Sequence, residues 1–325
     1  MQSPPPATIV VLGTGGTISG AAASPDDDLG YVAGTVGVGT LVAAAPAPVG
    51  VRVEAEQVAQ LDSKDMDFAT WRRLAERVAH HAARPEVTGV VVAHGTDTME
   101  ETAYFLGRVV AAAKPVVLTG AMRPATSRGA DGPRNLADAI AVAAGAGRAG
   151  TVVVFAGSVH AAREVRKVHS RRLDAFDSGE AGPLAVIAEG RIEERRPWPV
   201  EAPTGHDLLP QPGRPWPWVE IVTSDAGADG RAVRALVTAG VDGIVVAATG
   251  NGSIHRELAA ALEEAIATAR LPVLRATRCL DGGVAEKPGP SPFASAGALT
   301  PVQARVELVL RLLEGRRAGA VAPPG

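Results

Sequence analysis

Short apolar runs rich in valine alternate with helical patterns along the first half of this chain. The runs cover residues 8–12, 87–93, 115–119 and 151–155. Parallel strands that are buried on both faces have such continuous apolar sequences, and a crossover segment, usually a helix, connects each to the next. Between the first two runs, the apolar side chains of residues 68–78 recur at helical spacing. The alternation predicts an α/β fold with a mostly parallel sheet flanked by helices.

A second, smaller α/β domain is predicted for the last third of the chain. The length of 325 residues exceeds the usual size of one hydrophobic core. Strand-like runs resume at residue 219, and Thr300-Pro301-Val302-Gln303 has the composition of a helix start with a capping box. Before them, seven prolines between Pro197 and Pro217 indicate a stiff, extended connector. We therefore expect an N-terminal domain over 1–195, a proline-rich linker over 196–217 and a C-terminal domain over 218–325.

Charge and cysteine content argue against several classes of protein. A net charge of -3 does not suit a nucleic-acid surface, and no apolar run reaches the roughly 20 residues of a membrane helix. The single cysteine, Cys279, excludes an internal disulfide and agrees with a reducing compartment. The first six residues lack the basic region of a signal peptide. We expect a cytoplasmic protein without a membrane or nucleic-acid partner, and no residue spacing fits a metal site.

Two threonine-bearing segments directly follow the first two predicted strands. They are residues 14–20, Thr-Gly-Gly-Thr-Ile-Ser-Gly, and residues 94–102, His-Gly-Thr-Asp-Thr-Met-Glu-Glu-Thr. Ligands of open parallel sheets bind beyond the carboxyl ends of the strands, so the two segments can present hydroxyls to one crevice. Thr98 and Glu101 have the spacing of a capping box. Thr96 and Asp97 are then at a helix N-terminus, where amide groups favour a developing oxyanion.

These segments predict a hydrolase that acylates a threonine. A threonine hydroxyl is a weak nucleophile and needs a neighbouring base, so Thr17 and Thr96 are the two candidate nucleophiles. Lys167 is the most plausible basic partner. Asp97 could hold the lysine ammonium in place or bind a substrate ammonium. The residue pattern leaves open which threonine attacks.

Several other residues have simpler interpretations. We expect His94 to pack at a strand end and Glu100 to serve as a capping residue. His80 and His81 lie on a polar helical stretch and are expected to be solvated, and Cys279 is expected to be an inert core thiol. Residues 13–18 lack the third glycine of a dinucleotide fingerprint.

The two threonine segments, in this order and separation, resemble the paired signatures of the bacterial-type L-asparaginases, the asparaginase/glutaminase family of amidohydrolases. The resemblance spans nearly the whole chain. It continues through residues 31–42, 61–66, 120–124 and 130–133, the stretch around Lys167, and residues 250–252 and 299–301. It implies a cofactor-free enzyme that converts L-asparagine, with some activity on L-glutamine, to the acid and ammonia. It also implies a homotetramer built from dimers that share their active sites.

The resemblance implies a role for individual residues. Thr17 corresponds to the threonine that forms the acyl-enzyme, and Tyr31 to the tyrosine that assists proton transfer. Thr96, Asp97 and Lys167 correspond to a threonine, aspartate and lysine that together resemble a Ser-His-Asp arrangement. The other positions implied to bind substrate are Gly16, Asp62, Ser63 (α-carboxylate), Lys64, Ala121 (backbone contact to the amide end), and Ser253 and Glu286 from a neighbouring subunit.

Three departures from the family pattern concern the substrate-binding positions. Lys64 stands where Gln or Glu is more common, Ser253 replaces an asparagine, and the segment 278–286 is shorter than in the best-known members. They leave room for a catalytically weak or inactive protein that binds aspartate or asparagine. A further alternative is the ammonia-supplying subunit of a transfer-RNA-dependent amidotransferase.

Overall fold

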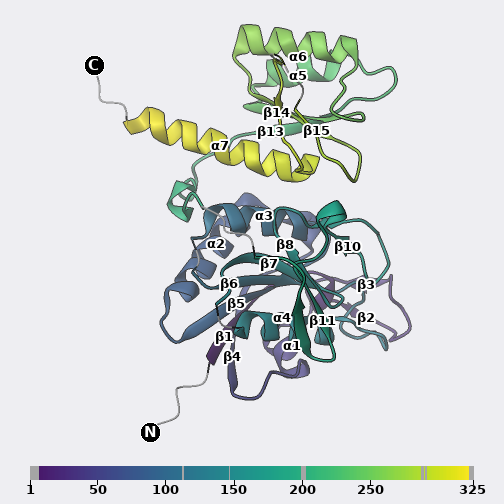
Figure 1. The fold of residues 1–325 in the computed structure, drawn as a ribbon, viewed down its shortest axis with the longest axis vertical. Coiled ribbons are helices and arrows are strands. Elements are labelled where there is room, and N and C mark those ends of the chain that lie inside the picture. The colour runs from purple at the N-terminus through teal and green to yellow at the C-terminus, as the bar shows by residue number, and fades with distance from the viewer. Residues whose placement is uncertain are drawn as a thin grey trace. The chain divides into compact units, whose positions relative to one another are not determined.

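The chain divides into two compact units between His206 and Asp207 in the computed structural model (Figure 1). The structure describes residues 7–111, 113–145, 147–198, 203–286, 289 and 291–321, with residues 318–321 as backbone only. Residues 1–6, 199–202 and 322–325 of the predicted domains and linker lie outside this part. Each unit has its own sheet, with eight strands in the N-terminal unit and four in the C-terminal unit. The predicted fold class, a larger N-terminal and a smaller C-terminal α/β domain, is confirmed.

Five parallel strands form the centre and one edge of the N-terminal sheet. The complete strand order is β12-β11-β8-β7-β6-β5-β1-β4. The parallel strands are β4 (Val51–Leu61), β1 (Ala7–Gly15), β5 (Val87–Ala93), β6 (Pro115–Thr119) and β7 (Gly150–Phe155). The antiparallel strands are β8 (Ser158–Ala161), β11 (Ala185–Ala188) and β12 (Arg191–Glu194). All four apolar runs predicted as strands are therefore neighbours in the sheet.

Helices cover both faces of this sheet (Figure 1). Helices α1 (Val38–Ala44) and α4 (Gly132–Ala144) lie on one face, and α2 (Phe68–Ala83) and α3 (Met99–Val109) on the other. Ile9 and Val11 of β1 belong to a buried cluster with Leu136 and Ile140 of α4. Residues between them on the strand face α2 and α3, because side chains alternate along a strand. This alternation explains why both faces of β1 are apolar.

Several short elements lie in the connections of the N-terminal unit. Two hairpins are formed by β2 (Ala21–Ala22) with β3 (Tyr31–Val32) and by β9 (Arg166–Lys167) with β10 (Phe176–Asp177). The 3-10 turns are η1 (Thr17–Ser19), η2 (Ser63–Asp65) and η3 (Gly179–Ala181). Turns η1 and η2 directly follow the carboxyl ends of β1 and β4, so they lie where the candidate site is expected.

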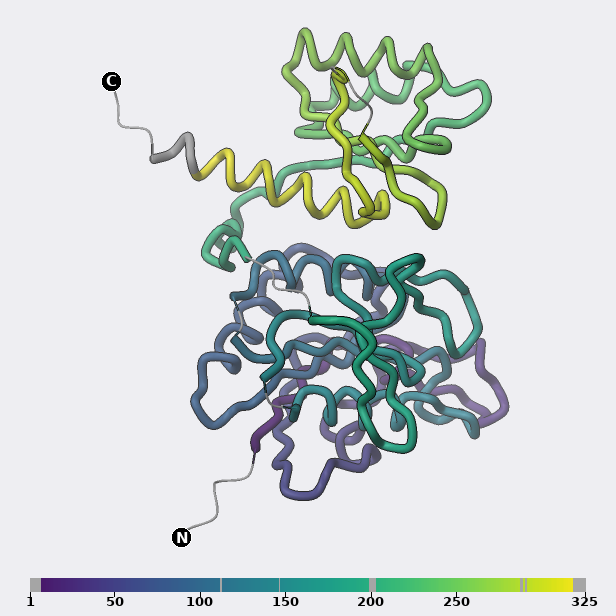
Figure 2. Tube along the Cα trace, in the orientation of Figure 1, coloured from purple at the N-terminus to yellow at the C-terminus, as the bar shows by residue number. Residues whose placement is uncertain are grey.

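The C-terminal unit is a four-stranded parallel sheet between two helical layers (Figure 2). Its strands are β13 (Val219–Thr223), β14 (Gly243–Ala248), β15 (Val273–Thr277) and β16 (Ala294–Ser295). Helices α5 (Arg231–Ala239) and α6 (Arg256–Ala269) lie on one face and α7 (Pro301–Val321) on the other. Thr300 and Gln303 exchange hydrogen bonds between side chain and backbone, so the predicted capping box is confirmed.

The structure corrects three predictions about single residues or segments. The linker range is not uniformly extended, because it contains the 3-10 turn η4 (His206–Leu208) and the buried residues Leu208 and Leu209. His81 is buried rather than solvated, and its polar partner is a side chain instead of water: Nε2 lies 2.7 Å from Oε2 of Glu56 on the edge strand β4. Cys279 is an exposed thiol rather than a core residue, because it follows the end of β15.

No helix in the described part of the chain is both long and apolar enough to cross a membrane.

Replacing Gly89 by alanine is expected to destabilise the N-terminal unit. A Cβ on Gly89 in β5 would lie 2.4 Å from the backbone oxygen of Ala143 in α4, so the helix would have to shift. We expect a loss of about 1–3 kcal/mol in the free energy of unfolding, measured by urea denaturation. Gly39→Ala is the matched control, because a Cβ there meets nothing within 4 Å and alanine favours helix α1. Equal stability of both variants would contradict the prediction.

Candidate active site

A crevice is expected between the carboxyl ends of β1 and β5, which are neighbours in the sheet. Gly13 of β1 is paired with Ala93 of β5. The chain that leaves β1 continues to α1 on one face, whereas the chain that leaves β5 continues to α3 on the opposite face. This divergence is the topological switch point at which open α/β sheets bind ligands. Thr17 follows β1 and Thr96 follows β5, so both candidate nucleophiles lie at this edge.

Glycines allow the loops after β1, β4 and β5 to pack backbone against backbone. Gly16 has a φ of 79°, and a Cβ on it would lie 2.1 Å from Cα of Gly95. The Gly16 amide donates to the Leu61 carbonyl oxygen at 2.8 Å. Gly95 in turn lies against Ser63, since a Cβ on Gly95 would be 2.4 Å from Ser63 Oγ. The loops after β1 and β5 therefore meet backbone against backbone, and the loop after β4 joins them through the Leu61 carbonyl oxygen and the Ser63 hydroxyl.

Thr17 shares a hydrogen bond with Tyr31. Oγ1 of Thr17 and Oη of Tyr31 are 2.7 Å apart. Thr17 begins turn η1, and Tyr31 is held in the β2–β3 hairpin, where it pairs with Ala22. The Tyr31 ring lies against Gly20, because a Cβ on Gly20 would be 2.7 Å from its Cδ2. The Thr17 hydroxyl thus has a defined proton partner in a nearly buried position.

The loop that carries Tyr31 is tied to residues 123–128. Asp28 accepts a hydrogen bond from Ser127 Oγ at 2.6 Å and forms an ion pair with Arg123 at 3.2 Å. Asp26 forms a second ion pair with Arg128, at 2.7 Å, and both of its partners are well exposed. The contacts of Asp28, together with the hydrogen bond from the Arg128 amide to the Pro25 carbonyl oxygen at 3.0 Å, hold the loop over residues 21–31 against the neighbouring loop and so hold Tyr31 beside Thr17.

The second threonine is in contact with an amine and, through it, a carboxylate. Lys167 Nζ donates hydrogen bonds to Thr96 Oγ1 at 2.8 Å and to Asp97 Oδ1 at 2.6 Å. The lysine side chain is 17% exposed and the aspartate side chain 56%, so the pair spans the border between protein and solvent. Thr96 itself is buried. The order hydroxyl, amine, carboxylate is one that can move a proton to or from Thr96 or a water beside it.

The start of α3 is organised differently from the prediction. Thr98 occupies the N-cap position but makes no side-chain capping hydrogen bond, so the predicted capping box is wrong. Its hydroxyl instead donates to the Ser63 carbonyl oxygen at 2.8 Å, while Ser63 Oγ accepts from the Asp97 amide at 3.2 Å. Glu100 is also no cap, because its Oε2 accepts the backbone amide of Lys167 at 2.9 Å. The hydroxyls and carboxylates of this helix start connect loops rather than cap the helix.

Lys64 is bound by carboxylates on both sides. Its Nζ lies 2.8 Å from Asp62 Oδ2 and 3.1 Å from Asp65 Oδ2, and these hydrogen bonds raise the pKa of the lysine. The lysine side chain is 61% exposed. The charge of Lys64 is thus neutralised by the two neighbouring aspartates. Together the three side chains keep a net negative charge.

Ala121 lies in a buried turn after β6. Asp131 holds this turn by accepting the amides of Met122 and Arg123 at 2.9 and 3.0 Å. Asn135 donates to the Gly120 carbonyl oxygen at 3.0 Å. The backbone around Ala121 is therefore fixed from α4, a role for Asp131 and Asn135 that the sequence did not reveal because it depends on long-range contacts.

Ser253 and Glu286 belong to the C-terminal unit. Ser253 forms a bridge with Thr249 across a tight turn. Within that turn, Asn251 Oδ1 accepts the amide of Ala285 at 2.7 Å. The two predicted residues are therefore on segments that Asn251 ties together, although Asn251 itself had no predicted role.

A chain of hydrogen bonds behind the second threonine loop fixes His94. His94 Nδ1 lies 2.7 Å from the carbonyl oxygen of Gly95, so this nitrogen carries the proton. Its Nε2 accepts from Thr102 Oγ1 at 3.0 Å, and Thr102 Oγ1 accepts from Trp71 Nε1 at 2.8 Å. Burial lowers the pKa of His94 to about 4, so the ring is neutral near pH 7. The prediction that His94 packs at the strand end is confirmed.

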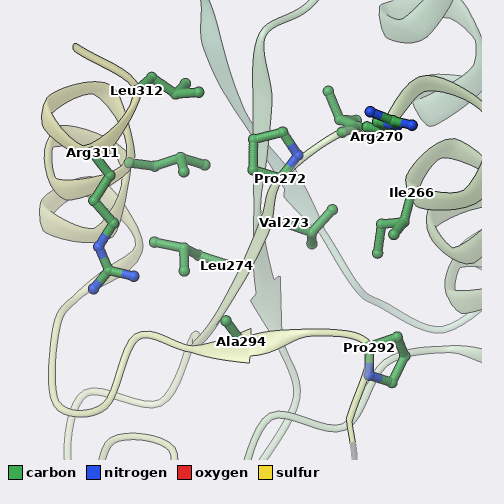
Figure 3. Close-up of a pocket in the computed structure, with 11 residues that line it drawn as sticks. Ile266, Arg270, Pro272, Val273, Leu274, Pro292, Ala294, Arg311 and Leu312 are labelled. Atoms are coloured by element: carbon green, nitrogen blue, oxygen red, sulfur yellow. The ribbon is translucent and has the colours of Figure 1, made fainter. Parts of the chain in front are cut away.

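A groove of about 560 Å³ in the C-terminal unit lacks the polar groups that surround Thr17 and Thr96 (Figure 3). Leu274 of β15 points toward α7, and Val273 points toward Ile266 of α6. Its lining is mainly aliphatic, with Arg270 and Arg311 as the charged residues.

The described residues include no group of three or more His, Cys, Asp or Glu side chains that could hold a metal ion. The candidate nucleophiles Thr17 and Thr96 and their hydrogen-bond partners lie instead at the carboxyl ends of β1 and β5, an arrangement that suits covalent hydrolysis.

Comparison with known proteins gives consistent matches over nearly the whole chain. The family models "Asparaginase, N-terminal" and "Glutaminase/Asparaginase C-terminal domain" match residues 8–199 and 218–322. L-asparaginase 2 of Escherichia coli (strain K12) is 38% identical over 94% of this chain and 89% of the relative. Glutaminase-asparaginase of Pseudomonas fluorescens biotype A is 34% identical over 94% and 86%. The crystal structure of a probable cytoplasmic L-asparaginase from Campylobacter jejuni has a TM-score of 0.86 at 37% identity, covering 94% of this chain and 95% of that one.

Replacing Thr102 by valine is expected to destabilise the protein by about 2–4 kcal/mol, because it leaves the buried Trp71 Nε1 and His94 Nε2 without partners. Valine has nearly the same shape as threonine, so the hydrogen bonds are the main change. Thr268→Val, on the exposed surface of α6, is the control and is expected to change stability by less than about 0.5 kcal/mol. Urea denaturation measures both variants. A Thr102→Val protein as stable as the parent would mean that the hydrogen-bond chain contributes nothing.

Proposed function

The chain belongs to the asparaginase/glutaminase family, and from this membership we propose that it hydrolyses the side-chain amide of L-asparagine through a threonyl acyl-enzyme. The observation that carries the mechanism is the pair of threonines at one sheet edge, each with its own proton partner. One hydroxyl contacts a tyrosine and the other contacts a lysine. This division suits a two-step reaction in which acylation and hydrolysis use different groups.

In the first step, Thr17 Oγ1 attacks the carbonyl carbon of the substrate amide. The hydroxyl proton leaves through Tyr31 Oη, 2.7 Å away, and is delivered to the amide nitrogen. The carbon–nitrogen bond then breaks, ammonia departs, and an ester links the substrate acyl group to Thr17. The Thr96 amide donates to no other described residue, so it is available to the oxyanion that forms during attack.

In the second step, a water molecule hydrolyses the ester. Thr96 and Lys167 orient this water, and Asp97 holds the lysine by the 2.6 Å contact to Nζ. The water oxygen bonds to the acyl carbon, Thr17 Oγ1 leaves, and one water proton returns to Thr17. The net reaction consumes one amide and one water and yields one carboxylic acid and one ammonia, without a cofactor.

The substrate's amino-acid end is bound by polar groups of the loops after β4 and β5. Ser63 contributes its hydroxyl to the α-carboxylate, and Asp97 offers a half-exposed carboxylate to the α-ammonium. Asp62 and Lys64 border this end, and the excess of acidic groups around Lys64 favours a cationic ammonium. Gly16 and the backbone of Ala121 border the amide end. Activity on L-glutamine is proposed in addition, because one relative is named a glutaminase-asparaginase.

The complete enzyme is proposed to be a cytoplasmic homotetramer, a dimer of dimers. In this assembly, the C-terminal domain over 218–325 supplies Ser253 and Glu286 to a catalytic domain of a neighbouring subunit. The contact between Asn251 and Ala285 supports a joint role, because it keeps the two segments together. The word cytoplasmic in the name of the Campylobacter jejuni relative supports the compartment.

Thr17→Ala is expected to lower kcat for L-asparagine by a factor of about 10³ or more, because it removes the attacking oxygen. Thr96→Ala is expected to lower kcat as well, but to leave an acyl group on the peptide containing Thr17, detected by mass spectrometry after acid quenching. Thr17→Ser is the control, since it keeps the hydroxyl and should retain part of the activity.

Near-normal turnover by Thr17→Ala would overturn the assignment, and an acyl group on Thr96 in that variant would exchange the roles of the two threonines. Parent protein that binds L-aspartate but releases no ammonia would instead support an amino-acid-binding protein.

The active species is expected to be a tetramer in light scattering at assay concentrations. Removal of the acid in Glu286→Ala is expected to raise KM or lower kcat without changing the unfolding of either domain, because the residue acts on a neighbouring subunit's site. A fully active monomer would contradict the shared site.

A further inference from the structure

Glu100 is a shielded carboxyl group at the active site that the two proposed steps do not use. It is the second residue of α3, and its Oε2 accepts the Lys167 backbone amide at 2.9 Å. Burial raises the pKa of Glu100 to about 7. A carboxyl group held in such an environment destabilises the fold when it ionises unless it has a partner, so its position beside the lysine needs an explanation.

The strand that carries Lys167 has little support of its own. Strand β9 contains two residues and pairs only with β10 in a separate two-stranded sheet. Isolated two-stranded ladders are marginally stable in water, so such a ladder does not fix a catalytic side chain by itself. The hairpin also packs on the main sheet, because the ring centroid of Phe176 lies 4.8 Å from that of Phe155 of β7. Lys167 itself needs further contacts to fix its direction.

The hydrogen bonds of Lys167 to residues outside the hairpin come from one short segment. Thr96 and Asp97 bind Nζ of Lys167, and Glu100 binds its backbone amide. The three residues lie within five positions on the turn that joins β5 to α3. The same strand-to-helix connection thus binds both the Nζ and the backbone amide of Lys167. These two points fix the direction of the lysine side chain.

We propose that Glu100 is a positioning residue for Lys167: it holds the lysine main chain so that Nζ reaches Thr96 and Asp97. The inference rests on the proposed amidohydrolase mechanism. Glu100 acts through Lys167 and does not touch the substrate. Its loss is expected to impair turnover more than substrate binding, because Thr17, Ser63 and Ala121 remain in place.

Ionisation of Glu100 connects this positioning to pH. The charged groups that face it are Glu101 on the same helix, which raises its pKa, and Arg166 and Lys167 on β9, which lower it. A carboxylate accepts an amide hydrogen bond more strongly than a neutral carboxyl group. The hydrogen bond between the Lys167 amide and Glu100 is therefore strongest above pH 7, and it weakens as the pH falls through the pKa of Glu100. The profile of kcat is expected to decline on this acidic side.

The test compares Glu100→Ala with Glu100→Gln by kcat, KM and pH profile. Alanine removes the acceptor and is expected to lower kcat about 10- to 100-fold with KM changed less than about threefold, the size of effect expected from a displaced catalytic group. Glutamine keeps an acceptor oxygen without a charge. It is expected to retain kcat within about threefold and to lose the acidic decline.

Glu101→Gln is the matched control on the same helix. It removes a neighbouring charge that raises the pKa of Glu100, so the acidic decline should move to lower pH while the plateau of kcat stays unchanged. Parent kcat in Glu100→Ala, or equal losses in the alanine and glutamine variants with unaltered pH profiles, would overturn the inference.

A crystal structure of Glu100→Ala separates this inference from the proposed function. Nζ of Lys167 displaced from Thr96 supports the positioning role even if the parent protein releases no ammonia, a result that would overturn the amidohydrolase proposal alone. An unmoved Lys167 overturns the positioning role even if the parent protein is an active asparaginase.

Discussion

The candidate site depends on the close contact of the Gly16 and Gly95 backbones. Any side chain at Gly16 would overlap the neighbouring loop, since its Cβ would be 2.1 Å from Cα of Gly95. Because the two loops touch directly, the residues that follow each glycine, Thr17 and Thr96, start from a common point. The sheet determines that both loops leave from one edge, and the glycines determine how near they come.

Sequence periodicity was sufficient for the elements that are buried on both faces, such as β1 and β5. It was insufficient for β4, an edge strand whose charged residues Arg52, Glu54 and Glu56 interrupt the apolar pattern. Local rules also failed for His81, Thr98 and Glu100, because each has a partner at least 25 residues away in sequence. The residue pattern selected Thr17 and Lys167 and the resemblance to a family added Tyr31, whereas their supporting residues could be found only in three dimensions.

Each proposed catalytic side chain is held by a partner outside its own element. Tyr31 is held beside Thr17 by the attachment of its loop to residues 123–128, and Lys167 by the turn before α3. The neutral ring of His94 fixes the Gly95 peptide by donating a hydrogen bond to its carbonyl oxygen. The short hairpins and turns at this edge are therefore ordered by side-chain contacts more than by their own backbone ladders, and local changes in those contacts can alter catalysis without unfolding the sheet.

The attachment of residues 21–31 has a consequence for how the enzyme meets its substrate. The ion pair between Asp26 and Arg128 is well exposed, so salt screens it and it contributes little to holding the loop down. Because Tyr31 lies at the end of this loop, a displacement of the loop would also remove the hydrogen-bond partner of Thr17. A change that loosens residues 21–31 is therefore expected to lower reaction at Thr17 while the sheet stays intact.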